Sequence, residues 1–222
     1  MDIKGKIAVI TGANGAIGSV LVKKLNECGV KCVSIDLEQE YSCDFRKPQD
    51  VIKLAETLKA KFPNIDYLYN IAGIGIYKNI EDLSVEEWET AFAINVTAPF
   101  IFSKYLSSNM RSSENPLIFN IGSGMGVISA ADRSSYCSSK FALRGLSLSL
   151  HRELKPKHID VCLFTLGSIM TPFGTGGIDK RKELERLGKK YLTVDEVTEK
   201  IIAITKSTNR EEEYTMYPEG YM

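Results

Sequence analysis

Short apolar runs rich in valine and isoleucine recur along the chain, and a stretch with helical periodicity follows each of them. Such runs predict strands buried on both faces of a parallel sheet. The predicted strands cover residues 6–11, 31–36, 66–71, 116–121 and 159–165, and the helical stretches cover residues 16–28, 48–61, 84–106, 134–155 and 194–206. This alternation predicts an α/β fold, a doubly wound parallel sheet with helices on both faces and right-handed crossovers.

Local signals add detail to this outline. Pro48 suits the first turn of a helix, and Ser84-Val-Glu-Glu87 has the form of a capping box. The polar, serine-rich residues 107–115 predict a loop. The irregular residues 172–192 predict either a short substrate lid or a solvated loop with a surface helix. Residues 211–217 predict a final edge strand.

Composition narrows the function classes. The chain has 222 residues, and its 28 lysines plus arginines balance 28 aspartates plus glutamates. The length suits one domain spanning residues 1–222, and the balanced charge predicts no nucleic acid or membrane partner. The five cysteines lack a CxxC pair and predict reduced thiols in a cytoplasmic protein. No cysteine, histidine and aspartate cluster has metal-ligand spacing, so we expect no metal.

A glycine-rich turn joins the first strand to the first helix. Gly12, Gly15 and Gly18 allow positive φ and a close backbone approach to a pyrophosphate, and the helix that follows directs free N–H groups at an anion. We expect Asn14 and Ile17, in the same turn, to contact the cofactor. Glycine also serves ordinary turns, but the strand–turn–helix context predicts a Rossmann-type dinucleotide site.

Asp36 ends the second strand, where a carboxylate accepts hydrogen bonds from the adenosine ribose hydroxyls and repels a 2′-phosphate. Considered singly, Asp36 would be a solvated acid at a strand end. In a chain that also has the glycine-rich turn, it predicts NAD rather than NADP. Strand ends are where open α/β sheets bind ligands. Further expected cofactor contacts are Asp44, Phe45, Asn70, Ala72 and Gly73.

Tyr136 and Lys140 are four residues apart in a helical segment, so they share one face. Lowering a phenol pKa from about 10 to about 7 takes roughly 4 kcal/mol, and one ammonium about 4 Å away supplies on the order of that at an effective dielectric near 20. Tyr136 is therefore the predicted acid/base. Ser123, just past a strand end, could orient the substrate oxygen, and Asn95 could anchor a water linked to Lys140; taken alone, each would be an ordinary polar residue.

In this order the motifs resemble those of the short-chain dehydrogenase/reductase family, in its compact single-domain form, over nearly the whole chain. They are Thr11-Gly-x-x-x-Gly-x-Gly18, Asp36, Asp44, Asn70-x-Ala-Gly73, Asn95, Ser123, Tyr136-x-x-x-Lys140 and Gly167-x-x-x-Thr171. The resemblance implies a catalytic tetrad made of Asn95, Ser123, Tyr136 and Lys140. It further implies that Lys140 binds the nicotinamide ribose and that Ile169 and Thr171 hold the carboxamide.

The resemblance also implies a homodimer or homotetramer. The residues that could form that contact, or could equally be ordinary core, are Trp88, Phe92, Val96 and Phe100. The chain departs from the family pattern at Ile71, Gly122 and Leu166, and it has a reduced C-terminal substrate segment. These departures affect the substrate pocket rather than the chemistry.

The sequence thus predicts an NAD-dependent oxidoreductase that interconverts an alcohol and a carbonyl. Two alternatives stay open: a non-enzymatic NAD-binding sensor or scaffold on the same fold, and a sugar-nucleotide epimerase or dehydratase, a class that usually has a larger C-terminal substrate domain. The substrate pocket is expected from Gly124, Met125, Ser168 and residues 172–192. These residues do not identify the small-molecule alcohol or carbonyl.

Overall fold

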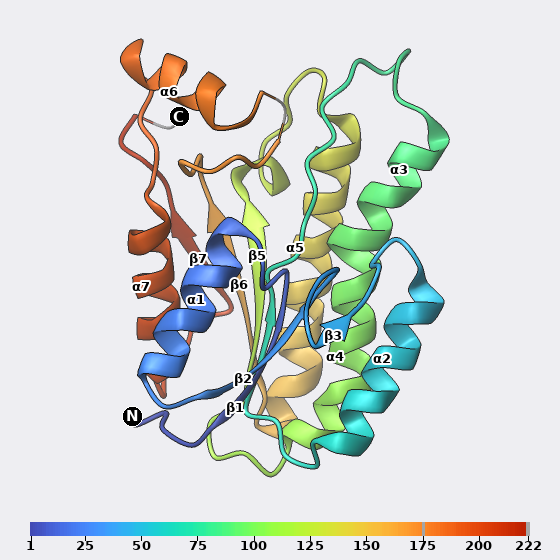
Figure 1. Ribbon diagram of the computed structural model, residues 1–222, viewed down its shortest axis with the longest axis vertical. Helices are drawn as coiled ribbons and strands as arrows, with labels where there is room; N and C mark the ends of the chain where they lie inside the picture. The colour runs from blue at the N-terminus through green and yellow to red at the C-terminus, as the bar shows by residue number, and fades with distance from the viewer. Residues whose placement is uncertain (175, 221–222) are drawn as a thin grey trace.

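The computed structural model describes residues 1–174 and 176–220. Within those residues the fold is built on a seven-stranded sheet with the order β3-β2-β1-β4-β5-β6-β7 (Figure 1). All neighbouring strands pair in parallel. The strands are β1 (Ile7–Thr11), β2 (Lys31–Asp36), β3 (Tyr41–Ser42), β4 (Tyr67–Asn70), β5 (Leu117–Ser123), β6 (Asp160–Leu166) and β7 (Glu213–Met216). The predicted doubly wound parallel sheet is confirmed.

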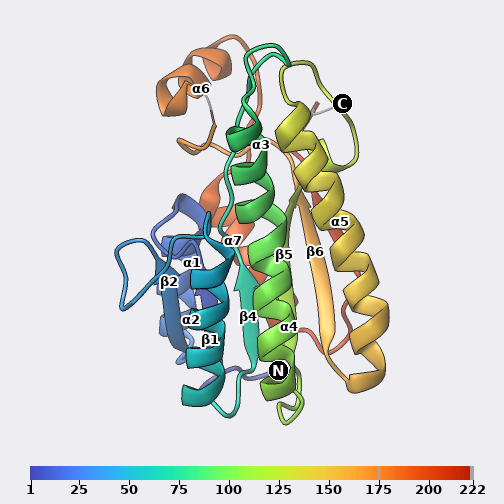
Figure 2. The same ribbon diagram turned by 90° about the vertical axis from the view of Figure 1, so that its right-hand side faces the viewer.

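Helices cover both faces of this sheet. On one face lie α1 (Ala16–Glu27) and α7 (Val194–Lys206), and on the other lie α2 (Pro48–Lys61), α4 (Ala98–Met110) and α5 (Ser134–Leu154) (Figures 1 and 2). Helix α3 (Val85–Phe92) runs through a π-helical turn, Ala93–Thr97, into α4. A further helix, α6 (Gly177–Arg186), lies beyond the carboxyl ends of the strands.

Each face of the sheet has its own apolar core, because successive strand residues point to opposite faces. In β1, Val9 packs into the core that contains Leu58 of α2. Its neighbour Ile10 packs into the other core, beside Leu21 of α1. Burial of both faces explains why the strands are near-continuous apolar runs rather than alternating ones. No helix in the described part of the chain is long and apolar enough to cross a membrane.

Most predicted elements are confirmed, including the edge strand β7 and the capping box. There Ser84 Oγ accepts a hydrogen bond from the Glu87 N–H, and a Glu87 carboxylate oxygen accepts one from the Ser84 N–H, both at 3.1 Å. The predicted loop 107–115 is wrong over its first four residues, because α4 continues to Met110. Met110 is fully buried one turn beyond Leu106, so packing on the sheet extends the helix.

Two other expectations need correction. The two-residue strand β3 was not predicted, because Tyr41–Ser42 is too short to show a pattern. The interpretation of Trp88 and Phe100 as ordinary core is wrong, since they are 37% and 42% exposed. Phe92 and Val96 are only half-buried, and neither belongs to the two cores.

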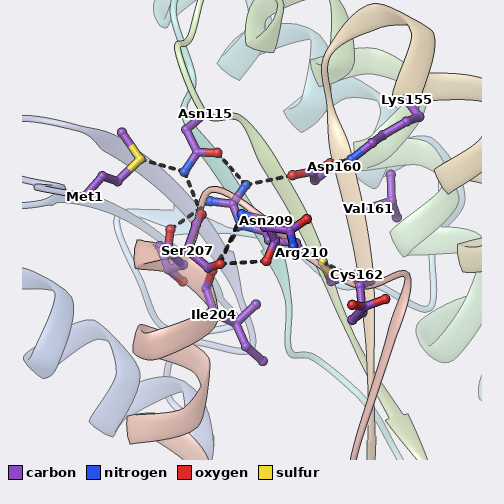
Figure 3. Close-up of polar contacts among 12 residues, drawn as sticks. Met1, Asn115, Lys155, Asp160, Val161, Cys162, Ile204, Ser207, Asn209 and Arg210 are labelled. Carbon is purple, nitrogen blue, oxygen red and sulfur yellow. Dashed lines mark hydrogen bonds and ion pairs between the residues drawn. The ribbon is translucent and has the colours of Figure 1, made fainter.

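A buried arginine ties together the amino-terminal end of the sheet (Figure 3). The Arg210 side chain is completely buried and forms an ion pair of 3.1 Å with Asp160, at the start of β6. It also donates to Asn115, before β5, and to the carbonyls of Ile204 and Thr205 at the end of α7. This cluster lies at the opposite end of the strands from the cavity described next, so its role is to hold the scaffold.

Candidate active site

A cavity of about 1290 Å³ lies at the carboxyl ends of the strands. This is the edge at which parallel α/β sheets bind ligands. The predicted site residues that line it are Gly12, Asn14, Gly15, Ile17, Asp36, Asp44, Phe45, Ala72, Gly73, Ser123, Tyr136, Lys140, Ile169 and Thr171. Gly18, Asn70 and Asn95 do not line the cavity and lie behind its wall. Of the residues expected in the substrate pocket, Met125 and Ser168 line it and Gly124 does not.

The glycine turn packs closely against the segment that follows β4. Gly12 has φ +69, and a Cβ atom there would lie 2.7 Å from the backbone of Ala72. A Cβ atom at Gly18 would lie 2.1 Å from the carbonyl oxygen of Gly12. Thr11 completes the contact, because its Oγ1 accepts the N–H groups of Ile71 and Ala72 at 3.2 and 3.3 Å. Gly18 therefore allows the helix to pack on the turn, while Gly12 faces the cavity.

Asp36 is fixed beside this turn. Its two carboxylate oxygens accept the backbone N–H of Asn14 at 2.9 Å and that of Leu37 at 2.8 Å. The Asn14 side chain in turn accepts a hydrogen bond from Gln39. The carboxylate thus lies in the cavity wall with its orientation set by backbone donors, as a ribose acceptor requires.

Asp44 lies in the same part of the wall but already has a charged partner. Arg46 pairs with it at 2.9 Å, and the hydrogen bonds from Arg46 hold the pKa of the Asp44 carboxyl below its usual range. Arg46 also lines the cavity, and no sequence motif marks it as a site residue. Because Asp44 compensates its charge, Arg46 is not a free cation at this end of the site.

Tyr136 and Lys140 extend from one face of α5, and both are buried. The Lys140 ammonium donates to the carbonyl of Ile121 at 3.0 Å and lies 5.9 Å from the centroid of the Tyr136 ring. Burial lowers the pKa of Lys140 to about 8. A Cβ atom at Gly73 would lie at an ordinary contact distance of 3.6 Å from this ammonium but only 3.2 Å from Asn95 Oδ1, so Gly73 leaves space mainly for the Asn95 side chain.

Asn95 lies in the π-helical turn between α3 and α4, where the sequence predicted an uninterrupted helix. Its side-chain carbonyl accepts the Ile74 N–H, and its amide donates to the Ile74 carbonyl and to Ser139 Oγ, each at 2.9 Å. Both amide hydrogens are used, so the side chain joins the segment after β4 to α5. Single π-helical turns occur frequently at functional sites.

Ser123 is the last residue of β5, and its side chain lines the cavity. Its Oγ accepts the Met125 N–H at 3.2 Å, which leaves the hydroxyl hydrogen to donate to another acceptor. Asn70, by contrast, donates to Asn120 at 2.7 Å between β4 and β5. Asn70 therefore links β4 to β5 at this edge of the sheet, and its contact with a cofactor stays a prediction.

The segment after β6 is anchored on both sides of residues 172–192. Leu192 donates to the carbonyl of Ser168 and accepts from the Met170 N–H, both at 2.9 Å, and the Thr171 N–H donates to the Ile169 carbonyl at 2.9 Å. Thr175, inside the predicted lid, lies outside the described residues. Seven described residues of the segment line the cavity, namely Pro172, Phe173, Lys180, Arg181, Leu184, Lys189 and Tyr191. Closure of this segment over the cavity stays a prediction.

Aromatic rings surround Tyr136; Tyr77 was not predicted as part of the site, whereas Phe173 belongs to the predicted pocket segment 172–192. The ring centroids of Tyr77 and Phe173 lie 5.4 and 5.9 Å from that of Tyr136. Both residues come from loops, where no periodicity marks them, and the only signal was an aromatic residue beside glycines. Within the described residues, no group of three or more histidine, cysteine, aspartate or glutamate side chains has the arrangement of a metal site.

Comparisons with known proteins agree with this geometry. The family model for short chain dehydrogenase matches residues 6–182. The NAD-dependent glycerol dehydrogenase of Listeria innocua is 27% identical over 188 residues, which are 78% of this chain and 74% of that protein. Among solved structures, 4-hydroxyisoleucine dehydrogenase complexed with NADH has a TM-score of 0.82 at 21% identity, covering 96% of this chain and 97% of the other. A short chain dehydrogenase of Burkholderia cenocepacia in complex with NADP has a TM-score of 0.85 at 22% identity, covering 98% and 97%.

Proposed function

The chain belongs to the short-chain dehydrogenase/reductase family, and from that membership we propose that it is an NAD-dependent enzyme that interconverts an alcohol and a carbonyl by hydride transfer. The family relationship supports an oxidoreductase with a nicotinamide cofactor. The proposed interconversion of an alcohol and a carbonyl rests on one observation. Tyr136, Lys140 and Ser123 line the same cavity as the glycine turn.

The residues at the glycine turn fit a dinucleotide. A side chain at Gly12 would collide with Ala72, so this wall is bare backbone that a pyrophosphate can approach. Helix α1 starts at Ala16 with Gly15 as its N-cap and no side-chain cap, so its first N–H groups are available to an anion. The cofactor, when bound, supplies the hydride acceptor for alcohol oxidation.

The chain's own residues supply the proton chemistry. With a pKa of about 8, the Lys140 amine is mostly protonated at neutral pH, and a positive charge close to a phenol favours the phenolate. Tyr136 would take the hydroxyl proton from the alcohol during oxidation and return it to the carbonyl oxygen during reduction. Ser123 would donate a hydrogen bond to the same oxygen. Asn95 is a positioning residue, because it fixes α5 to the segment after β4.

A preference for NAD follows from Asp36. The carboxylate lies in the cavity wall next to the turn, where a 2′-phosphate of NADP would meet its negative charge. Arg46 offers little compensation because it is paired with Asp44. We therefore expect tighter binding of NAD than of NADP, measured by calorimetric titration of each cofactor into the purified protein.

Replacement of Tyr136 by phenylalanine tests the central role. The variant keeps the ring that packs against Tyr77 and Phe173 and removes only the hydroxyl. With a panel of alcohols and NAD, we expect turnover to fall on the order of a thousandfold, with NAD binding retained. The matched control is Tyr67→Phe, because the Tyr67 hydroxyl is buried without a hydrogen-bond partner in β4.

The outcomes separate the candidate functions. Full turnover by Tyr136→Phe would refute the assigned role. Binding of NAD by the wild type without turnover across the panel would favour the sensor or scaffold. Product formation without release of NADH would favour an epimerase or dehydratase.

We also propose that the chain works as one domain in the cytoplasm and forms a homodimer or homotetramer. The exposed apolar residues Trp88 and Phe100, on α3 and α4, support self-association. The five cysteines are free thiols, which suits a reducing compartment. Sedimentation equilibrium of the wild type and of Phe100→Ser tests the assembly, and a monomer at all concentrations would contradict it.

A further inference from the structure

Three cationic side chains gather at the end of the cavity near Tyr136. Arg133 lies at the start of α5, Arg181 on α6, and Lys189 in the loop after α6, and all three line the cavity. Helix α6 and its loops lie beyond the carboxyl ends of the strands (Figure 1). Partial desolvation, and then the positive charges of Arg133 and Arg181, lower the pKa of Lys189. The Lys189 ammonium therefore lies close enough to both guanidinium groups to be repelled by them.

These cations have no anionic partner in the described part of the chain. No carboxylate there forms an ion pair with Arg133, Arg181 or Lys189. The acidic residue closest in sequence, Asp132, accepts a hydrogen bond from Asn79 at 3.3 Å. Lys180, next to Arg181, is paired with Glu183 at 2.9 Å.

Aromatic rings and a carbonyl hold the cations in place. The Arg133 guanidinium lies 4.7 Å from the centroid of the Tyr77 ring. Arg181 and Lys189 each lie 5.5 Å from the centroid of Tyr191. Arg181 also donates to the carbonyl of Phe173 at 2.6 Å. Stacked guanidinium groups are restrained, so the cluster is built to a fixed shape.

The cluster adjoins the reacting end of the cavity. The Tyr77 ring contacts both Arg133 and Tyr136. Its centroid lies 4.7 Å from the Arg133 guanidinium carbon and 5.4 Å from the centroid of the Tyr136 ring. Phe173 joins Tyr136 to Arg181 differently, because its ring packs beside the Tyr136 ring and its backbone carbonyl accepts a hydrogen bond from Arg181. Only one aromatic residue therefore separates each guanidinium from the proposed acid/base. Of the acidic residues that line the cavity, Asp36 at the end of β2 and Asp44 after β3 belong to the other end. Asp132, next to Arg133, also lines the cavity, but its side chain is exposed and forms a hydrogen bond with Asn79 rather than an ion pair with the cluster.

Like charges held together without a counter-ion destabilise a folded protein. A solvated surface would let such side chains move apart, but here Arg133 and Arg181 are half-buried and stacked. A ligand that brings negative charge would remove the repulsion. Arginine is the side chain best suited to bidentate contact with a carboxylate or a phosphate.

We propose that the substrate carries an anionic group, a carboxylate or a phosphate ester, which binds between Arg133, Arg181 and Lys189 while its hydroxyl or carbonyl lies at Tyr136. This inference rests on the proposed oxidoreductase function, which places the reacting group of the substrate at Tyr136. It narrows the substrate class to hydroxy acids and phosphorylated alcohols, with their carbonyl counterparts.

The first test measures binding without turnover. Inorganic phosphate, malonate and neutral glycerol are titrated calorimetrically into NAD-loaded wild type, Arg133→Gln and Arg181→Gln. We expect wild type to bind phosphate or malonate but not glycerol, and each variant to bind the anion at least about tenfold more weakly. The matched control is Arg186→Gln, because Arg186 is exposed on the same helix and does not line the cavity. Preference for phosphate over malonate, or the reverse, distinguishes the two anion sources.

The second test measures turnover of neutral alcohols, hydroxy acids and phosphorylated alcohols. We expect charged substrates to be preferred, and Arg181→Gln to raise KM about tenfold for them with little change in kcat. A lack of anion binding by the wild type overturns the proposal, whether or not any alcohol is oxidised. Equal use of neutral and charged alcohols by wild type and variants also overturns it. A wrong oxidoreductase assignment would give a different result from a wrong anion site. In that case the wild type would still bind the anion, but no turnover that depends on Tyr136 would be found.

Discussion

Replacing Lys140 by methionine should make the folded protein more stable near neutral pH while removing its activity. Lys140 is 4% exposed, and its ammonium donates to the Ile121 carbonyl. Burial lowers its pKa from 10.5 to about 8. At about 1.36 kcal/mol for each pH unit, this difference corresponds to a cost of roughly 3 kcal/mol for keeping the ammonium charged in the fold. The lost hydrogen bond offsets about 1 kcal/mol, so the variant should gain about 2 kcal/mol.

The gain should depend on pH in a defined direction. Below pH 8 the lysine is protonated in both the folded and the unfolded chain, so the full cost is present. Between pH 8 and 10.5 the folded protein has released the proton that the unfolded chain still holds. The free energy of unfolding of the wild type therefore rises with pH across this window relative to Lys140→Met. The advantage of the variant should shrink by roughly 2 kcal/mol between about pH 7 and about pH 9.5.

Urea unfolding followed by circular dichroism measures both quantities without cofactor. The control is Lys53→Met, an exposed position on α2, where lysine and methionine have similar helix propensity. That variant should match the wild type at both pH values. If Lys140→Met is less stable than the wild type near neutral pH, or if the difference between them does not change with pH, the reasoning about the buried ammonium is wrong.

Three further predictions concern the scaffold and the cofactor site. Arg210→Met should lower the free energy of unfolding in urea by about 1–3 kcal/mol, because Asn115 and the carbonyls of Ile204 and Thr205 lose their buried donor while Asp160 keeps its ion pair with Lys155; equal stability would contradict this. Burial would raise the pKa of the Glu213 carboxyl, but hydrogen bonds from Arg144 and Thr165 outweigh it and hold the pKa below 4.5. The advantage of the wild type over Glu213→Gln, about 1–3 kcal/mol, should therefore be present above that pH and disappear on acidification, as thermal unfolding at several pH values can show. Gly12→Ala should weaken NAD binding at least about tenfold in calorimetric titration, because φ is +69 and Ala72 lies 2.7 Å from the added Cβ; the control Gly145→Ala, with open space around the added methyl group, should bind NAD normally.

The parts of the fold that the sequence predicted are those in which the physical signal is local. A strand buried on both faces must be apolar throughout, so β1, β4 and β6 were visible as runs. The Ser84 capping box needs only residues within one helical turn. The spacing of Tyr136 and Lys140 places both on one face of any helix. Their arrangement on α5 could therefore be predicted before the rest of the site.

The features that were missed depend on contacts between distant segments. The end of α4 at Met110 is decided by burial against the sheet, and the π-helical turn at Asn95 is held by hydrogen bonds to Ile74 and Ser139. In the sequence, a charged residue such as Arg210 suggests solvent exposure. It is buried because the fold surrounds it with hydrogen-bond partners from three separate segments.

The same division applies to the candidate site. Local pattern alone determined the glycine turn after β1, the helix that carries Tyr136 and Lys140, and most of the order of strands and helices, because backbone conformation and helical or strand periodicity act over a few residues. Tertiary structure alone decided that Arg133, Arg181 and Lys189 meet beside Tyr136. Electrostatic forces act through space rather than along the chain, so a cluster of charges from separate elements exists only after the fold has formed.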